Sequence, residues 1–422
     1  MLNIETQRLN REISLISIMQ KRFDEEFEKE IKPISQNIAN EPLCYHCKGR
    51  CIGKLGNGYT NVERAMAIGG KDYKENCELC HGIFYKFDKY YKAAKNLLDT
   101  IEYDSFVIGS KYDTEMLYNE ESLWQRVNTP WGESIKLEFN REFGKYFSAL
   151  SGKEGKRDNP DVSIVVDTVF DDVSITIFPV FIYGRYKKYD RNVTQTEWLC
   201  KACNGKGCER CNFTGKMYEN SVEGYIAKVA LPMFMAEGDK FHGMGREDID
   251  VRMLGNGRPF IIEMKSPKKR KVDLKILENN INESSKNVIE VGALKYVSNN
   301  MVEKIKNAKV VKEYEAIFTT AAKLEKVKEA INSLKGATIC QKTPTRVLGR
   351  RADIERKKEV KDIILVDYKG DKYKIKIKAE GGTYIKELIH GDRGRTMPSI
   401  ASIVGEECNV VELDVVWIYD DV

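Results

Sequence analysis

Hydrophobic and polar residues recur along the chain with periods that switch between helical and extended spacing. Residues 83–98 and 134–150 carry apolar side chains at helical spacing, and the aromatic residues of 83–98 are placed to pack in a core. Residues 161–167 and 173–183 alternate or run apolar, which is typical of strands. This interleaving of helices and strands predicts an α+β fold with a mixed sheet.

The C-terminal half continues the mixture without an internal repeat. Helices are expected over residues 221–235 and 322–334, and strands over residues 260–264, 272–277, 314–319, 373–379 and 410–418. Near the N-terminus, residues 106–109 have the pattern of a short strand. Residues 2–31 have a charged, roughly helical pattern that Pro33 closes, so we expect a lead-in helix there.

Length and cysteine positions divide the chain into four segments. A chain of 422 residues exceeds what one hydrophobic core usually serves, so more than one domain is expected. The predicted segments are an N-terminal helix with a first cysteine cluster (1–82), a strand-helix-strand block (83–199), a compact four-cysteine module (200–220) and a large mixed domain (221–422).

Composition argues against a membrane protein. The mean hydropathy is −0.47, no apolar run reaches 18 residues, and the first 23 residues are too charged for a signal peptide. We therefore expect a cytoplasmic monomer without a membrane partner. The formal net charge is only +5, from 69 lysine and arginine residues against 64 acidic residues, and this balance alone says little about partners.

The basic residues concentrate in two windows. Residues 258–278 hold seven basic and three acidic residues, and residues 341–358 hold seven basic and two acidic residues. Such an excess is the electrostatic signature of nucleic-acid binding, although each window alone also fits a solvated face. The RNA-contacting candidates are Lys268, Lys269, Arg346, Arg350 and Arg351. The run at 267–272 also looks like a nuclear-localisation signal, but its place after a predicted strand favours an RNA-backbone contact.

Nine of the eleven cysteines fall in two clusters with the spacing of structural metal sites. The first cluster supplies Cys44, Cys47, Cys77 and Cys80, and the second supplies Cys200, Cys203, Cys208 and Cys211. Paired thiolates from tight turns can close a tetrahedral zinc site, and the alternatives for the first cluster are an iron–sulfur cluster or a redox dithiol. Because sulfur fills all four positions, we expect one or two structural zinc ions and no catalytic metal.

Charge is densest between Gly243 and Phe260, where three acidic residues stand among three arginines and several glycines. The acidic residues are Glu247, Asp248 and Asp250. Burying unpaired ions is costly, so the stretch fits either a solvated hairpin tip or a site that acts on a polar substrate. Glycine allows positive φ, so the turn can present one carboxylate into a cleft while arginines keep it ionised.

Family resemblance favours the second alternative. Gly245-Arg-Glu-Asp248 resembles the Gly-Arg-x-Asp motif of pseudouridine synthases, and residues 312–316, 341–353 and 382–399 resemble later motifs of the same enzymes. In order and spacing, the four stretches are similar to the archaeal and eukaryotic tRNA pseudouridine 54/55 synthase family across almost the whole C-terminal domain. Only this joint match is specific, since a lone Gly-Arg-x-Asp would be weak. Residues 83–199 resemble a THUMP-type RNA-binding module.

The resemblance implies a pseudouridine-synthase catalytic domain together with a zinc-containing, THUMP-like N-terminal region. It implies an isomerase that breaks the glycosidic bond of uridine and rejoins the ring through carbon, without nucleotide cofactor or catalytic metal. The implied partner is tRNA, and the implied target is position 54 and/or 55 of its TΨC arm.

The resemblance also assigns roles to single residues. Asp248 becomes the catalytic residue, and a nearby cation, either Lys386 or Arg246, is expected to keep it ionised. Tyr314 and Tyr384 offer flat faces for an extruded uracil. Substrate binding is therefore expected at Arg246, Tyr314, Tyr384 and Lys386.

Two neighbours of these residues carry weaker expectations. Thr383 is expected to cap a helix that begins at Tyr384, which places Lys386 in the first turn. A cation there opposes the helix dipole, so Lys386 needs another partner, and Asp248 is the expected one. Asp250 has no predicted role beyond pairing with an arginine, Arg252 or Arg258.

Two competing functions remain open from the sequence. A non-catalytic RNA-binding adaptor would use the THUMP-like and zinc modules alone, but it gives no reason to keep Asp248, Tyr314, Tyr384 and Lys386 together. A DNA-binding zinc protein would need a groove-reading helix beside its cysteines, and the sequence has no recognisable one.

Overall fold

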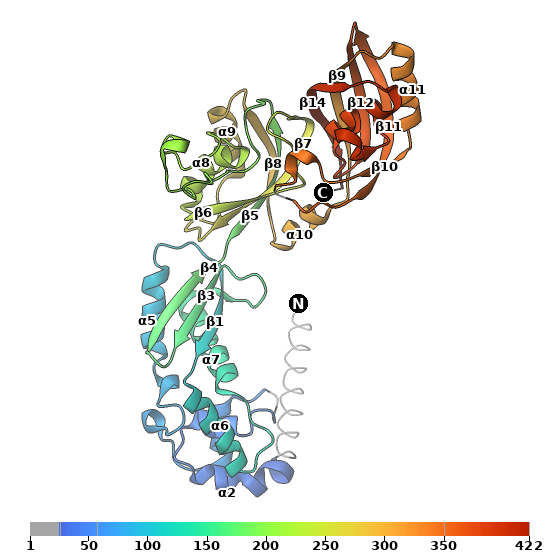
Figure 1. Cartoon of the computed structure of the whole chain (residues 1–422). Helices are drawn as coiled ribbons and strands as arrows, with labels where there is room; N and C mark the ends of the chain where they lie inside the picture. The colour runs from blue at the N-terminus through green and yellow to red at the C-terminus, as the bar shows by residue number, and fades with distance from the viewer. Residues whose placement is uncertain (1–24, 26, 57, 350, 422) are drawn as a thin grey trace, which may run out of the picture. The chain divides into compact units, whose positions relative to one another are not determined.

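The computed structural model describes residues 25, 27–56, 58–349 and 351–421, which form two compact units (Figure 1). The first unit ends at Phe178, and the second begins at Pro179. Each unit has a hydrophobic core of its own, as expected for separate domains.

The predicted lead-in helix over residues 2–31 lies mostly outside the described residues. Its last residues form a short π-helical turn, η1 (Phe27–Ile31), which leads directly into α2 (Lys32–Asn40). Pro33 therefore opens a helix instead of closing one. Proline is tolerated in the first helical turn because its missing N–H would have no partner there.

A four-stranded sheet with the order β2-β1-β3-β4 forms one layer of the first unit. Its strands are β1 (Ser105–Lys111), β2 (Glu154–Gly155), β3 (Val162–Asp167) and β4 (Asp172–Ile177). The helix α5 (Phe87–Leu98) packs on β4, and α7 (Ile135–Ser151) packs on β1. The ring centroid of Phe87 lies 5.4 Å from that of Phe139 and 5.3 Å from that of Phe143. The aromatic residues of α5 therefore pack in the core, as their spacing predicts.

Short helices surround the first cysteine cluster. They are α3 (Tyr45–Arg50), α4 (Asn61–Ile68), η2 (Lys74–Asn76), η3 (Ile83–Tyr85) and α6 (Thr114–Arg126). Arg50 is fully buried, pairs with Glu120 of α6, and has its Nε 3.0 Å from a carboxylate oxygen of Glu138 in α7. The sequence pattern misses α6, because its buried side includes the charged Glu120 beside Met116 and Leu123.

The predicted strand over residues 173–183 is two strands that belong to different sheets. The first, β4, ends at Ile177, and β5 (Val180–Lys188) pairs with two strands of the second unit. Pro179 separates them, since proline has no N–H to donate to a strand ladder. Residues 179–199 therefore lie in the second unit, whereas the sequence pattern groups them with the strand-helix-strand block.

A ten-stranded mixed sheet organises the described part of the second unit. Its main path has the order β13-β10-β11-β12-β9-β14-β7-β5-β8, and β6 also pairs with β7. Besides β5, the strands are β6 (Gly238–Gly243), β7 (Arg252–Lys265), β8 (Ile289–Val297), β9 (Val311–Thr320), β10 (Thr338–Gln341), β11 (Arg356–Lys369), β12 (Lys372–Glu380), β13 (Thr396–Met397) and β14 (Cys408–Tyr419). The strands β7 and β14 pair in parallel, and the other described pairs are antiparallel. The predicted α+β class with a mixed sheet is confirmed.

Helices and helical turns connect these strands. They are η4 (Glu209–Cys211), α8 (Val222–Phe234), α9 (Leu274–Ser284), α10 (Asn300–Asn307), α11 (Leu324–Leu334), η5 (Thr345–Val347), α12 (Ile385–His390), η6 (Gly391–Gly394) and α13 (Ile400–Val404). The predicted strand over 272–277 is wrong, because this segment begins α9. The carboxylate of Asp273 accepts hydrogen bonds from the N–H groups of Lys275 and Ile276, which is a helix N-cap.

The expected Thr383 cap is also wrong. The Thr383 hydroxyl donates to the carbonyl oxygen of Glu380, and α12 begins at Ile385 without a side-chain cap. Several strands escape the sequence pattern because they are short, as β10 and β13 are, or expose much of their surface, as β8 and β11 do. Little burial leaves little apolar alternation to detect.

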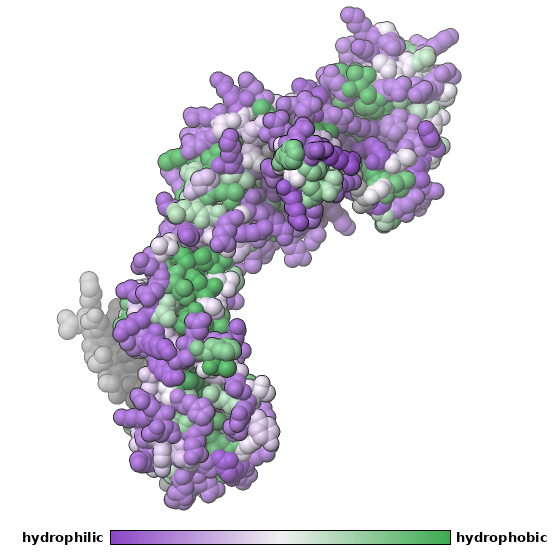
Figure 2. Space-filling view, turned by 60° about the vertical axis from the view of Figure 1, so that its left-hand side comes forward, coloured by the Kyte–Doolittle hydropathy of each residue, from purple (hydrophilic) through white to green (hydrophobic). Residues whose placement is uncertain are grey.

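Hydrophilic side chains cover most of the molecular face seen in Figure 2, with smaller groups of hydrophobic side chains between them. This agrees with a chain in which 32% of residues are charged. Within the described residues, no helix combines the length and the apolar character that crossing a membrane requires.

Candidate active site

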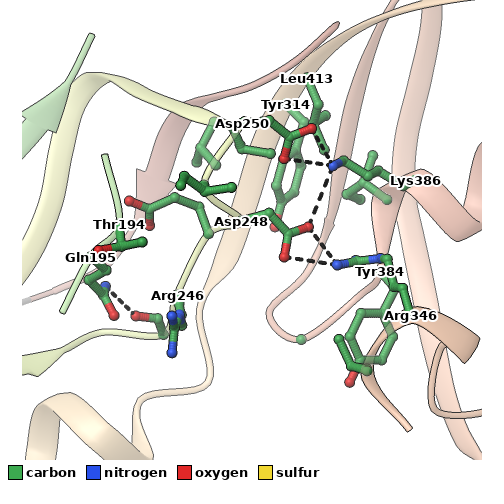
Figure 3. Close-up of a pocket in the computed structure, with 18 of the residues that line it drawn as sticks. Thr194, Gln195, Arg246, Asp248, Asp250, Tyr314, Arg346, Tyr384, Lys386 and Leu413 are labelled. Carbon is green, nitrogen blue, oxygen red and sulfur yellow. Dashed lines mark hydrogen bonds and ion pairs between the residues drawn. The ribbon is translucent and has the colours of Figure 1, made fainter. Parts of the chain in front are cut away.

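The loop between β6 and β7 carries the acidic motif and sends neighbouring carboxylates to different places. Glu247 is buried, with one carboxylate oxygen 2.8 Å from Nε of Arg258, and it accepts a 2.8 Å hydrogen bond from the hydroxyl of Tyr186. The next residue, Asp248, has 38% of its side chain exposed and lines a pocket (Figure 3). One carboxylate therefore anchors the loop from inside, and the following one faces the pocket.

Buried donors fix the backbone of this loop. The Lys188 ammonium, fully buried in β5, donates to the carbonyl oxygens of Ile249 at 2.8 Å and Asp248 at 3.3 Å. The side-chain amide of Gln195 donates to the carbonyl oxygen of Gly245 at 2.9 Å. Gly245 has a φ of +76°, a conformation that residues with a Cβ rarely adopt. The direction of Asp248 is thus set by the loop's backbone.

Two cations hold the Asp248 carboxylate. Nη1 of Arg346 lies 2.8 Å from it, and Nζ of Lys386 lies 3.7 Å from it (Figure 3). The expected alternative, Arg246, instead places its guanidinium 4.7 Å from the ring centroid of Trp198. Arg346 was expected to contact RNA, and the structure makes it the nearest cation to Asp248.

Arg346 is itself held from the other side. Its Nε lies 2.7 Å from a carboxylate oxygen of the buried Glu387 in α12. Burial opposes the charge of Arg346, but Glu387 and Asp248 together raise the pKa of its guanidinium above its ordinary value. A cation placed between two carboxylates stays charged and keeps a fixed position.

Asp250 pairs with neither of the arginines expected for it. Its carboxylate lies 2.7 Å from Nζ of Lys386 (Figure 3), whereas Arg252 pairs with Asp414 and Arg258 with Glu247. Burial would raise the pKa of the Asp250 carboxyl, but the hydrogen bond from Lys386 lowers it below its ordinary value. Lys386 therefore has two acidic partners, of which Asp250 is the nearer.

The two predicted tyrosines both line the pocket. Tyr314 comes from β9 and is buried, and the backbone of Tyr384 is held by two 2.9 Å hydrogen bonds with the Gln341 side chain. Nη1 of Arg351 lies 3.1 Å from the Tyr384 hydroxyl. The cavity measures about 730 Å³, which is within the usual range for small-molecule sites. Polar, charged and aromatic groups thus converge on one pocket of the second unit.

The two basic windows contribute unequally to this pocket. The window 341–358 supplies Arg346 and Arg351, but Arg350 lies outside the described residues. From the window 258–278, Arg258 lines the pocket, whereas Lys268 and Lys269 are exposed in the loop after β7 and do not line it. Basic residues of both windows therefore line the Asp248 pocket, but neither Lys268 nor Lys269 is among them.

Several residues of the site have no signal in the sequence. Segments that the pattern assigns to the preceding domain supply Tyr186, Lys188, Gln195 and Trp198. These residues reach the pocket or its loop only through pairing of β5 with β7. Tyr186 and Lys188 are fully buried, although their segment reads as an exposed basic edge. Long-range strand pairing had to be known before they could be found.

Comparison with known proteins matches both units to sequence families. The family described as "Pus10, C-terminal" matches residues 181–419, and the one described as "Pus10 THUMP domain, archaeal" matches residues 90–167. The protein named tRNA pseudouridine synthase Pus10 of Pyrococcus furiosus is 40% identical over 398 residues, covering 91% of this chain and 97% of that protein. Its namesake in Methanothrix thermoacetophila is 38% identical over 413 residues, covering 89% and 91%.

The chain belongs to the Pus10 family. It is therefore an enzyme, an isomerase of the tRNA pseudouridine synthase family, and the predicted THUMP module is confirmed. A solved structure titled "Crystal Structure of a Cbf5-Nop10-Gar1 Complex" is also similar, with 16% identity over 55% of this chain and 57% of that chain. Its TM-score of 0.30 is too low to support a structural argument.

Both cysteine clusters of this Pus10 chain come together as four-thiol groups. In each tetrad the four Sγ atoms lie within 4.8 Å of one another, and the tetrads contain the eight cysteines predicted from the spacing. The additional cysteine of the first cluster, Cys51, directs its thiol to the carbonyl oxygen of Cys47 at 3.4 Å instead. Each group can therefore hold one metal ion through four sulfur ligands.

The second tetrad also shows the backbone donors that thiolates require. N–H groups of Cys208 and Gly215 donate to the sulfur of Cys211 at 3.2 and 3.3 Å, and the N–H of Gly207 donates to that of Cys203 at 3.2 Å. Although burial opposes ionisation, these bonds lower the pKa of the Cys211 thiol to about 6. The donor set thus fits a metal that prefers thiolates.

Loss of charge at Glu247 and at the adjacent Asp248 is expected to change the free energy of unfolding by different amounts. Glu247→Gln leaves Arg258 buried without its counter-ion and should lower the free energy of unfolding of the second unit by about 3–5 kcal/mol. Asp248→Asn, at a partly exposed position, should change it by no more than about 0.5 kcal/mol. Urea unfolding of both variants checks this, and equal destabilisation by the two would contradict the assignment of Glu247 as the anchor.

Proposed function

We propose that this chain converts uridine to pseudouridine in tRNA at position 54 and/or 55 of the TΨC arm, with Asp248 as the catalytic carboxylate. The observation that carries the proposal is the position of Asp248 in the pocket, held by Arg346 and Lys386 and accompanied by Tyr314 and Tyr384. Relatives that match almost the full chain are named tRNA pseudouridine synthases, which supports tRNA as the substrate.

The reaction requires one bond to break and one to form at the same sugar carbon. The C1′–N1 bond breaks, a C1′–C5 bond forms, C5 gives up a proton and N1 takes one, so the composition of the nucleotide is unchanged. A carboxylate that attacks a carbon or removes a proton must be ionised for either role. Arg346 and Lys386 place two positive charges within 4 Å of the Asp248 carboxylate.

The pocket suits a base that has left its stack. A uracil in a folded tRNA arm is hidden by stacking and pairing, so the enzyme must extrude it before any chemistry at C1′ or C5. Tyr314 and Tyr384 supply aromatic faces to receive the ring, and Leu413 and Val415 of β14 add apolar surface to the same pocket. These residues would hold the base while its attachment to the sugar changes.

Exposed basic residues are proposed to contact the tRNA backbone. Lys268 and Lys269 are exposed, and Arg351 reaches the rim beside Tyr384. The THUMP module in residues 90–167 is proposed as the second RNA contact of the chain. Backbone contacts of this kind set affinity and register and leave the choice of base to the pocket.

We also propose that both cysteine tetrads hold zinc as a structural ion. Four sulfur ligands complete a tetrahedral shell and leave no position for substrate or water, so the metal would stabilise the fold and take no part in the isomerisation. The first tetrad is buried in the core of the first unit, and the second lies in the module just before α8.

Asp248→Asn is expected to lower the single-turnover rate of pseudouridine formation in a tRNA transcript by about 10³-fold or more, because the amide carries no negative charge. The Kd for the transcript should stay within about threefold, since a rim charge contributes little to total affinity. Rates are measured with enzyme in excess, and Kd by filter binding at fixed salt.

Two further variants serve as comparisons for Asp248→Asn. Asp371→Asn, in the exposed turn between β11 and β12, is a matched control expected to keep the wild-type rate. Asp250→Asn should fall between the two, because it releases Lys386 from its nearer partner while Asp248 keeps Arg346. Wild-type turnover in Asp248→Asn, or absence of pseudouridine in every tRNA tried with the unmodified chain, would reject the proposed function in favour of an RNA-binding adaptor.

Metal analysis of the purified protein is expected to give about two zinc ions per chain, one for each tetrad. Cys203→Ser should release about one zinc and lower the melting temperature, because structural metal sites contribute directly to folding free energy. Inductively coupled plasma spectrometry and thermal unfolding measure both. A protein that carries iron with a visible chromophore, or no metal at all, would contradict the zinc assignment.

A further inference from the structure

The strand β9 places a buried lysine beside the proposed base-stacking tyrosine. Lys312 and Tyr314 are two residues apart in an extended strand, so their side chains project from the same face. Both line the pocket that contains Asp248, and Lys312 is only 7% exposed. A cation has thus been brought almost completely out of water at the edge of the proposed base site.

Among the described residues, the ammonium of Lys312 has no counter-ion. None of them forms a hydrogen bond or an ion pair with its Nζ, and the acid that acts on its charge, Glu247, is already engaged by Arg258 and Tyr186. Nζ lies where a side chain of Gly245 would be, 2.8 Å from the position of an added Cβ, with Nη1 of Arg258 3.4 Å from the same point. Lys312 therefore packs next to a like charge.

This arrangement destabilises the charged lysine. Burial is the largest cause and the neighbouring Arg258 is the second, and together they lower the pKa of Lys312 to about 7 in spite of Glu247. An apolar residue of similar length would avoid this free-energy cost. Costs of this kind persist in folded proteins mainly where the group acts on a ligand.

Three other cations that line the pocket are already paired with acids. Arg346 lies between Asp248 and Glu387, Lys386 pairs with Asp250, and Arg258 pairs with Glu247. Their positive charge is compensated before any substrate enters. Lys312, which is buried, therefore offers a charge that a substrate can use without breaking an existing ion pair.

We propose that Lys312 is a further catalytic residue, whose ammonium donates a hydrogen bond to a carbonyl oxygen of the uracil ring in the pocket and stabilises the negative charge that the ring acquires when its glycosidic bond breaks. This rests on the proposed function. The electron pair of the C1′–N1 bond stays with the ring and spreads onto its carbonyl oxygens. When C5 joins C1′, the C5 proton leaves and N1 takes a proton, so that charge is lost again.

The electrostatics of the site agree with this role. A negative ring beside Lys312 supplies the missing counter-charge and favours its protonated form, whereas in the empty pocket that form is disfavoured. The interaction is therefore stronger with the charged ring than with neutral uridine, and only such differential stabilisation accelerates the chemical step. Lys312 shares its strand with Tyr314, the proposed stacking residue, so the proposal places the ammonium beside the base.

Lys312→Met should separate a catalytic role from a structural one. The single-turnover rate of pseudouridine formation should fall by about 100-fold, as for removal of one donor from a site of developing charge. The Kd for the tRNA transcript should stay within about threefold, because neutral substrate gains little from the ammonium. Lys312→Gln, which is uncharged but polar, should lose as much rate.

The melting temperature of Lys312→Met should equal or exceed that of the wild type, since methionine fills a similar volume without a buried charge. Lys309→Met, an exposed lysine just before β9, is the matched control and should leave both rate and melting temperature unchanged. These measurements use the full chain with its metal content verified, so a folding defect cannot imitate a catalytic one.

The difference in stability between Lys312→Met and the wild type should depend on pH in a defined direction. The folded-state pKa of about 7 lies below the ordinary value of 10.5, so the unfolded chain binds more protons between these values and wild-type stability rises with pH across that window. The groups facing Lys312 are Glu247, Arg258 and Tyr314. The gap in melting temperature between Lys312→Met and wild type should therefore be wider at pH 7 than at pH 9.5.

An unchanged rate in Lys312→Met would overturn the proposal while leaving the function of the enzyme intact. Parallel loss of rate and melting temperature would also overturn it, because Lys312 would then be a structural residue. If the wild-type protein forms no pseudouridine in any tRNA, the proposed function fails together with this role. The wild-type measurement distinguishes that outcome from failure of Lys312 alone.

Discussion

The buried ion pair between Glu247 and Arg258 is the constraint on which the site depends. Arg258 belongs to β7, which the sheet fixes between β5 and β14, and Glu247 belongs to the loop just before it. An ion pair removed from water is stable only in one geometry with its remaining hydrogen bonds made, and Tyr186 provides one of them. Because the sheet fixes β7, the ion pair also fixes the loop that carries Glu247. The position of Asp248, the next residue in that loop, is fixed with it.

Charge in the pocket is arranged in two classes. Asp248, Asp250 and Glu387 pair with Arg346 and Lys386, so these side chains hold one another in place. Among the described residues, Lys312 has no such partner and is kept by the packing of its strand. Paired charges give a rigid site at low cost, and an unpaired charge gives one that responds to the charge of its ligand.

In the first unit, a buried arginine lies beside the first cysteine tetrad. The Arg50 guanidinium contacts Glu120 and Glu138 and donates to the sulfur of Cys47 at 3.1 Å, so it joins three helices to the first tetrad. A tetrad of thiolates carries excess negative charge even with a divalent ion bound, and a buried cation beside it offsets part of that charge. A metal bound by this tetrad would therefore be coupled to helix packing in the unit.

The sequence by itself determined the class of the fold, the eight cysteines of the tetrads and four of the stretches that meet in the pocket, because each depends on local spacing or on a short motif. It could not determine the partners. Contacts between segments far apart in the chain place Arg346 instead of Arg246 beside Asp248, bring Lys386 to Asp250 and move β5 to the second unit. The expected Thr383 cap fails for a local reason, because its hydroxyl bonds the carbonyl oxygen of Glu380 instead. Charge composition says how many ion pairs a motif can form, but only strand pairing and burial decide which charges meet.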